Sequence, residues 1–194
     1  MEINAYQIPP NNDIYIQQNL VTDISKNTDY DSFHIFANQS ISYKQVLGQN
    51  LFPTTTEVGI ELNHYFQTSM FCSSTFQNFF IDDKQKKLID NFWYCGNALA
   101  VVPFASSVIH PKFKIYGGAG QAYGTDNTNS KVPKSLVLYY WSLKPTALAE
   151  FNISESFKFS LGAAYQLVFS NDSSDLATNT SGLEGTASIS YNFK

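Results

Sequence analysis

The last twelve residues alternate without interruption between two kinds of side chain. Leu183, Gly185, Ala187, Ile189, Tyr191 and Phe193 occupy one set of alternate positions, and Glu184, Thr186, Ser188, Ser190 and Asn192 occupy the other. Successive side chains of a β-strand point to opposite faces, so this pattern predicts a two-sided strand that ends in aromatic residues. The pattern by itself leaves two settings open, a soluble sandwich with a second layer over the apolar face and a wall in contact with lipid.

The same alternation recurs along the rest of the chain. It predicts eight strands, at residues 13–25, 32–46, 57–70, 92–104, 112–124, 137–151, 157–170 and 182–193, with Gln39 interrupting the apolar face of the second. Each is long enough to cross a bilayer when tilted, which takes about 9–11 residues. The glycines Gly117, Gly118 and Gly120 in the fifth strand suit a tightly curved wall.

The connections alternate between long and short. Long polar connections are expected at 26–31, 73–87, 125–134 and 171–181, and tight turns near 48–55, 107–111 and 152–156. Transmembrane barrels have long loops outside and short turns in the periplasm. We therefore predict an all-β fold, an antiparallel up-and-down transmembrane β-barrel of eight strands. Residues 13–194 would form this single domain, with 1–12 as a periplasmic lead.

Composition agrees with a chain that hides its apolar residues by interleaving them. The 194 residues are 43% hydrophobic and 15% aromatic, yet they contain no apolar run of the length a membrane helix requires. The net charge is −4 and lysines do not cluster, which argues against nucleic acid as a partner. The only hint of helical periodicity lies at Asp82 to Asp90, and 171–181 is expected to be a solvated loop with little to bury.

The amino terminus shows no targeting signal. Met1, Glu2 and Asn4 are not followed by a basic region and an apolar stretch, so no signal peptide is recognisable. Either the protein is cytosolic or the sequence is a mature chain with an added methionine. We favour the second interpretation, with the chain located in the outer membrane, because the strand pattern requires a bilayer.

Cys72 and Cys95 lie at similar predicted heights on two adjacent strands. An oxidising compartment would allow a disulfide between them if their Cα atoms come within about 7 Å. The alternative is a pair of free, buried cysteines.

Seven charged residues fall on the predicted inner face of the barrel. They are Glu57, Glu61, Lys112, Lys114, Lys144, Glu150 and Lys158. An eight-stranded barrel is filled by side chains, so these charges are expected to pair with each other or with water. A structural polar core is favoured over a permeation path.

Three segments resemble a known group of proteins. PKFKIYGGAGQAYG (Pro111 to Gly124), TALAEFNISESFKFSLGAAYQL (Thr146 to Leu167) and the closing strand with Ile189, Tyr191 and Phe193 are similar to the small bacterial outer-membrane barrels of the OmpA and OmpX type. In that group the terminal aromatic is the last residue, whereas here Lys194 follows Phe193. The resemblance implies a fold, the outer-membrane bilayer as partner and a Gram-negative envelope, and it implies no reaction.

Catalysis and cofactor binding find little support. Some barrels of this kind modify lipid A with a histidine beside a serine, but the only histidines here are His34, His64 and His110. His64 is expected on the lipid face, His110 in a periplasmic turn, and His34 in the lumen near the outer rim. We therefore predict no enzyme activity, no cofactor and no metal site, since the three histidines are scattered and no Cys/His cluster is present in the sequence.

Three functions stay open. The first is a barrel that acts through its extracellular loops in envelope integrity, adhesion or host contact. Its loop aromatics Phe76, Phe79, Phe80 and Trp93 would then contact partners or fold back over the mouth. The second is a small-solute or lipid-handling channel. The third is a soluble, lipocalin-like ligand carrier.

Overall fold

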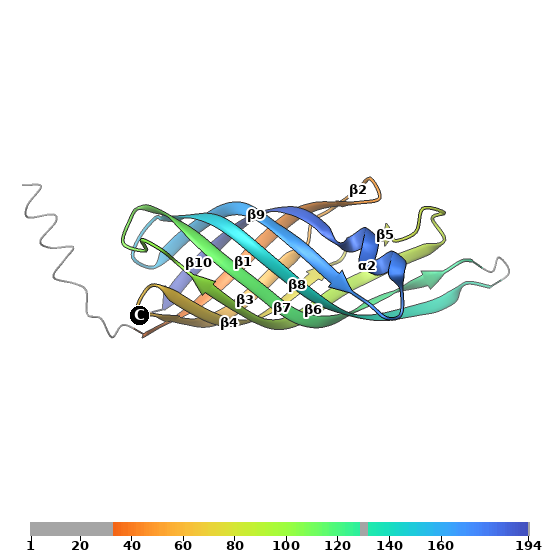
Figure 1. The fold of residues 1–194 in the computed structure, drawn as a ribbon, viewed down its shortest axis with the longest axis horizontal. Helices are drawn as coiled ribbons and strands as arrows, with labels where there is room; N and C mark the ends of the chain where they lie inside the picture. Colours follow the sequence, from red (N-terminus) through yellow and green to blue (C-terminus); the bar gives the residue numbers. More distant parts are fainter. Residues whose placement is uncertain (1–32, 129–131, 194) are drawn as a thin grey trace, which may run out of the picture. The chain divides into compact units, whose positions relative to one another are not determined.

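The computed structural model describes residues 33–128 and 132–193, and within them the chain forms one closed antiparallel barrel (Figure 1). Neighbouring strands follow the order β10-β9-β8-β7-β6-β4-β3-β1, and β10 pairs with β1 to close the circle. Eight long strands make up this wall: β1 (Phe33–Val46), β3 (Thr54–Leu62), β4 (Phe66–Thr75), β6 (Lys87–Val101), β7 (Ile109–Asp126), β8 (Lys134–Asn152), β9 (Phe157–Phe169) and β10 (Gly182–Phe193). The predicted fold class is confirmed.

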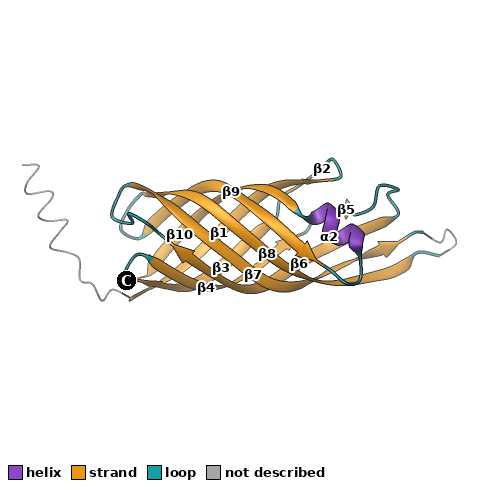
Figure 2. Cartoon of the chain, viewed as in Figure 1, coloured by secondary structure: helices purple, strands orange, loops and turns teal. Residues whose placement is uncertain are grey.

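Three short elements sit at one end of the barrel. They are β2 (Gln49–Leu51), β5 (Phe79–Phe80) and the helix α2 (Ser174–Thr180), shown in purple in Figure 2. We call this the loop end, since it also holds the connection between β7 and β8. The opposite end, the turn end, holds the connections 63–65, 102–108 and 153–156. Among the described residues, no helix is both long and apolar enough to span a membrane.

The predicted strand at 57–70 is wrong, because two strands occupy it. Leu62 pairs with Phe66, and between them a tight turn places Asn63 and His64 at φ of 51° and 60°. Leu62 and Phe66 both face outward and are four residues apart, so the alternation runs through the turn without a change of phase. This split supplies the eighth strand. The strand predicted at 13–25 and the link at 26–31 lie outside the described residues, and the barrel closes without them.

The split also changes which end one connection occupies. The turn predicted at the short-turn end near 48–55 lies instead at the loop end, because β1 runs from the turn end upward and finishes at Val46. Figure 1 shows β2 near α2 and β5 at this end. The turns near 107–111 and 152–156 do share the other end with 63–65.

The outside of the wall is apolar. On β8, outward Tyr139, Trp141 and Leu143 alternate with buried Tyr140, Ser142 and Lys144. Aliphatic side chains such as Leu161 and Ile115 occupy the middle of the outer surface. Aromatic residues occur toward both ends, with Phe157, Tyr191 and Phe193 at the turn end and Tyr139, Trp141 and Phe169 at the loop end. An exposed apolar surface on all sides, bordered by two aromatic belts, is typical of a barrel that spans a bilayer.

The loop half of the lumen is filled by apolar and aromatic side chains. Phe92 stacks on Tyr140 with ring centroids 4.6 Å apart, and Phe79 meets Phe92 edge to face. Gly120 lies between Tyr94 and Tyr140 in the strand register. A Cβ at Gly120 would collide with the carbonyl oxygen of Trp93, so the missing side chain permits this close packing.

Two expectations for the loop segments are wrong. Residues 171–181 contain the helix α2, whose Leu176 is fully buried in the apolar cluster at the loop end. The sequence did not reveal this helix, because only Leu176 and Thr180 of its seven residues are buried, too few to form a periodic apolar pattern. The segment Asp82 to Asp90 is not helical. Its last residues belong to strand β6, which begins at Lys87 and in which Ile89 is fully buried.

Candidate functional site

The turn half and the middle of the lumen are filled by charged side chains that contact one another. All seven predicted lumen charges are buried there: Glu57, Glu61, Lys112, Lys114, Lys144, Glu150 and Lys158. Each lies on an inward position of its strand. They form three tiers along the barrel, which we define below by their glutamates.

The turn-end tier is built on Glu61 and Glu150. Lys158 lies between these two carboxylates, 2.8 Å from Glu61 and 3.9 Å from Glu150. Lys112 donates to the second oxygen of Glu150 at 2.7 Å. Neither glutamate has any exposed surface. A buried carboxylate needs a charged partner, and lysines supply it for both.

The middle tier is built on Glu57. Lys114 donates to both carboxylate oxygens at 2.8 Å, and Asn38, Ser69 and Tyr116 donate to the same group. The Lys114 ammonium also lies over the Tyr116 ring, 5.3 Å from its centroid. Glu57 and Lys114 belong to β3 and β7, which are not neighbours in the wall, so their contact crosses the lumen.

The loop-side tier is built on Glu184, which lies 3.3 Å from Lys44 and 3.5 Å from Lys144. Lys44 also donates to the Gln166 side chain at 2.6 Å and to the backbone oxygen of Thr180 in α2 at 3.1 Å. This tier therefore connects the charged half of the lumen to the helix that covers the loop end.

Lys44, Glu184 and His110 also belong to this network, in addition to the seven charges predicted for the lumen. The signal was present, since each has the same parity as the inward residues of its strand. His110 was expected in a turn but lies buried in β7, with its ring nitrogens near Glu150 (3.2 Å) and the Ser107 carbonyl (2.9 Å). Neither nitrogen of His110 is thus directed at a hydroxyl group that it could activate.

The mouth of the barrel at the loop end is covered. Ser173 caps α2 by accepting from the Leu176 amide, and Asn179 donates to the Ile81 carbonyl at 2.8 Å. Lys87 of β6 donates to Asp175 of α2 at 2.7 Å, and this hydrogen bond raises the pKa of Lys87 above its ordinary value. These contacts hold the helix over the lumen.

The aromatic residues of the first long loop divide between the two roles considered for them. Phe79 is buried in the apolar cluster and so folds back over the mouth. Phe76 is 75% exposed and Phe80 is half-buried, whereas the placement of Trp93 in the loop is wrong: it lies in β6, on an outward position of the wall between Ser74 and Gln121. Phe76 is therefore the one of the four that is positioned to contact a partner.

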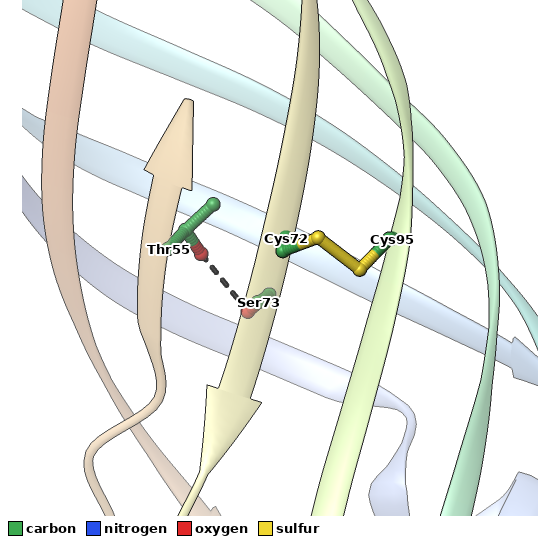
Figure 3. Close-up of a disulfide and its surroundings, with 4 residues drawn as sticks. All are labelled: Thr55, Cys72, Ser73 and Cys95. Atoms are coloured by element: carbon green, nitrogen blue, oxygen red, sulfur yellow. Dashed lines mark hydrogen bonds between the residues drawn. A yellow bond between two sulfur atoms is a disulfide. The ribbon is translucent and has the colours of Figure 1, made fainter. Parts of the chain in front are cut away.

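Cys72 of β4 and Cys95 of β6 are joined by a disulfide (Figure 3). They are direct partners in the strand register, and their Cα atoms are 4.1 Å apart. Cys72 faces outward, whereas its neighbour Ser73 faces inward and accepts a hydrogen bond from Thr55. The disulfide covalently links β4 and β6, the two strands on either side of the loop that carries β5.

The structure brings together two of the three histidines. His64 does not face lipid but lies in the turn between β3 and β4, and His34 lies at the turn end rather than near the outer rim. Their ring centroids are 5.3 Å apart. Across the described residues, no group of three or more His, Cys, Asp or Glu side chains is arranged to hold a metal ion.

Ile189, Tyr191 and Phe193 all face outward on β10, the strand that closes the barrel against β1. Tyr191 meets Phe157 and Phe193 edge to face, each at 4.9 Å between centroids. These rings form part of the aromatic belt at the turn end.

Comparison with known proteins identifies the fold. No protein-family model matches the sequence, and no curated protein sequence matches it. The structure is similar to that of Neisserial surface protein A, with a TM-score of 0.54 and 12% identity over 83% of this chain and 97% of that one. It is also similar to Ail, the attachment invasion locus protein of Yersinia pestis, in complex with the heparin analogue sucrose octasulfate. For Ail the TM-score is 0.51 and the identity 14%, over 83% of this chain and 97% of the other. The chain thus has the fold of the small outer-membrane barrels of the OmpA and OmpX type.

Proposed function

We propose that this chain is an integral protein of the bacterial outer membrane, that it has no enzyme activity, and that it acts through its loop end outside the cell. The observation that carries the proposal is the combination of an apolar outer wall with a lumen closed by paired charges and by α2. With lipid on the outside and a filled interior, the loop end is the part of the wall that extends furthest from the lipid-facing middle. Envelope integrity, adhesion and host contact are roles open to such a surface.

The names of the two structurally similar proteins support an action at the cell surface, and they supply no further support. One is called a surface protein and the other an attachment and invasion protein. Their identity to this chain is too low to transfer a ligand. Ail was solved with a heparin analogue, but the described loop end here carries six aspartates and four lysines: Asp82, Asp83, Asp90, Asp126, Asp172, Asp175, Lys84, Lys86, Lys87 and Lys134. The sequence adds one more lysine, Lys131, to the β7–β8 connection. This net negative charge disfavours a polysulfated partner.

The location is tested by an epitope tag in the β7–β8 connection, with a matched tag in the turn at 153–156, in bacteria that export the chain. We expect an antibody to stain intact cells only for the first tag, and both after the outer membrane is opened. Staining of intact cells only through the turn at 153–156 would overturn the orientation. A protein that stays monodisperse without detergent would overturn the membrane assignment.

The role is tested with cells that display the chain, compared with cells that display it with Phe76 replaced by Ser. We expect the unmodified chain to increase adhesion to host cells or matrix, and the F76S variant to do so less. Adhesion equal to cells lacking the chain would contradict a contact role and favour a role in envelope integrity.

The channel alternative requires a continuous aqueous path. The tiers of paired charges and the buried Leu176 and Phe79 lie across that path, so the lumen favours the closed barrel. The lipocalin-like alternative requires an apolar ligand cavity inside, whereas charged side chains occupy the interior and apolar ones the outer surface.

A further inference from the structure

The turn end of the barrel places two imidazole rings beside a carboxylate. His34 lies on an inward position of β1, directly opposite Glu61 of β3. His64 follows Glu61 by three residues in a turn, at φ 60°, and its half-exposed ring places Nδ1 3.1 Å from the Glu61 carboxylate. The rings of His34 and His64 are 5.3 Å apart between centroids and tilted by 31°.

Glu61 is held in place and in turn orients His64. One of its oxygens lies 3.1 Å from Nδ1 of His64, while the other accepts from Lys158 at 2.8 Å and from Gln67 at 2.6 Å. A histidine that binds a metal through one ring nitrogen characteristically donates its other nitrogen to a carboxylate, which fixes the ring and its tautomer. Glu61 is placed to be the orienting carboxylate of His64, through its contact with Nδ1.

The separation of the rings suits a shared ion. Two imidazoles bound tetrahedrally to one metal, with metal–nitrogen bonds of about 2.0–2.1 Å, have centroids roughly 5 Å apart. We propose that His34 and His64 together bind a divalent first-row transition-metal ion at the turn end, with Glu61 as the orienting carboxylate. Water completes the coordination, because the protein supplies two ligands.

The chemistry of the pair sets the selectivity. Neutral imidazole suits Zn²⁺, Ni²⁺ and Cu²⁺, and it discriminates against Mg²⁺ and Ca²⁺, which prefer oxygen ligands. The ion must compete with the contacts that His64 already makes. Its site would also lie near the Lys158 ammonium, which contacts the same glutamate. The expected affinity is therefore moderate and follows the order Cu²⁺ above Ni²⁺ and Zn²⁺. This inference is independent of the role of the loop end.

The chain offers a favourable test, because its only histidines are His34, His64 and His110. The full 194-residue chain, refolded in detergent, is titrated calorimetrically with Zn²⁺ and separately with Mg²⁺. We expect one Zn²⁺ per chain and no Mg²⁺ binding. His34→Gln and His64→Gln should each weaken Zn²⁺ binding at least tenfold, whereas His110→Gln, the matched control, should leave it unchanged.

Two results would overturn the proposal. One is Zn²⁺ affinity that neither His34→Gln nor His64→Gln lowers, and the other is the same affinity in the folded chain and in the chain unfolded by urea. The unmodified chain gives an independent readout if a variant fails to refold. Bound Cu²⁺ should show an electron paramagnetic resonance spectrum with two coordinated nitrogens, and a spectrum without imidazole nitrogens would count against the site.

Discussion

At the scale of single residues, adjacent positions of one strand lie in different solvents. Leu161 is 46% exposed on the outer wall, and the preceding Ser160 is 2% exposed and donates to Glu150 in the lumen. A substitution is therefore judged by the face on which it falls and not by its distance from a site. Two predictions test the two faces.

Leu161→Arg should lower the free energy of unfolding in phospholipid vesicles by about 2–4 kcal/mol, because it places a charge near the middle of the lipid-facing wall. Val132→Arg is the control, an apolar residue that is 70% exposed in the β7–β8 connection. Its effect should be within about 0.5 kcal/mol. Urea unfolding followed by tryptophan fluorescence measures both, and equal costs would show that Leu161 does not face lipid.

Glu57→Gln should lower the free energy of unfolding by about 3–5 kcal/mol, because it leaves the buried Lys114 without its charged partner. The double variant Glu57→Gln with Lys114→Met should recover much of this loss, since it removes both charges. The same urea titrations give the coupling energy of the pair. Strictly additive costs would mean that Glu57 and Lys114 do not interact in the folded barrel.

At the scale of elements, α2 acts as a cover because several separate contacts hold it. Leu176 packs into the apolar cluster, the Thr180 carbonyl accepts from Lys44, and Asp175 accepts from Lys87. The Lys87 side chain is partly exposed, so that pair contributes no more than about 1 kcal/mol. The cover should therefore open locally before the wall unfolds.

The Lys87 pair gives this opening a pH dependence. The pKa of Lys87 is raised in the folded chain from the ordinary value of 10.5, so its stabilising effect is complete below that value and is lost as pH rises through the folded pKa. Hydrogen exchange of α2 should be slower in the unmodified chain than in Lys87→Met at neutral pH. The two should converge above the folded pKa, and a difference that grows with pH would contradict this account.

At the scale of the whole molecule, the lumen is a packed core with two halves. Five lysines and four glutamates fill the turn half and the middle, and aromatic residues with α2 and Phe79 fill the loop half. The outer wall is mostly apolar, with a few polar exceptions such as Gln39, Thr56 and Asn97. The molecule is thus inverted relative to a soluble barrel, with its charges inside and its apolar side chains outside.

A barrel filled in this way should not conduct. We expect planar-bilayer recordings of the refolded chain to show no stable, large conductance at moderate voltage. Lys144→Glu sets a second carboxylate beside Glu184 and should destabilise the barrel, but the variant that folds should also show no large conductance, since Lys144 lies in a closed network rather than in a pore. A stable conductance whose ion selectivity changes in Lys144→Glu would contradict the closed lumen and favour transport.

The amino-acid sequence determined the properties that depend on neighbouring residues. Whether a residue of β7 to β10 faces lipid or lumen follows from strict alternation, because the backbone of a strand turns each side chain by half a revolution. Alternation did not reveal the turn at 63–65, since Leu62 and Phe66 on either side of it both face outward and keep the pattern in phase. Asn63, a residue that tolerates positive φ, was the signal that marked it.

Tertiary structure alone decided which distant groups meet. The Glu57–Lys114 pair crosses the lumen, the rings of His34 and His64 meet through a turn, and α2 lies over the mouth because Leu176 enters the apolar cluster. Such contacts depend on strand register and barrel closure. Both are collective results of packing all eight strands, and no local pattern in the chain specifies them.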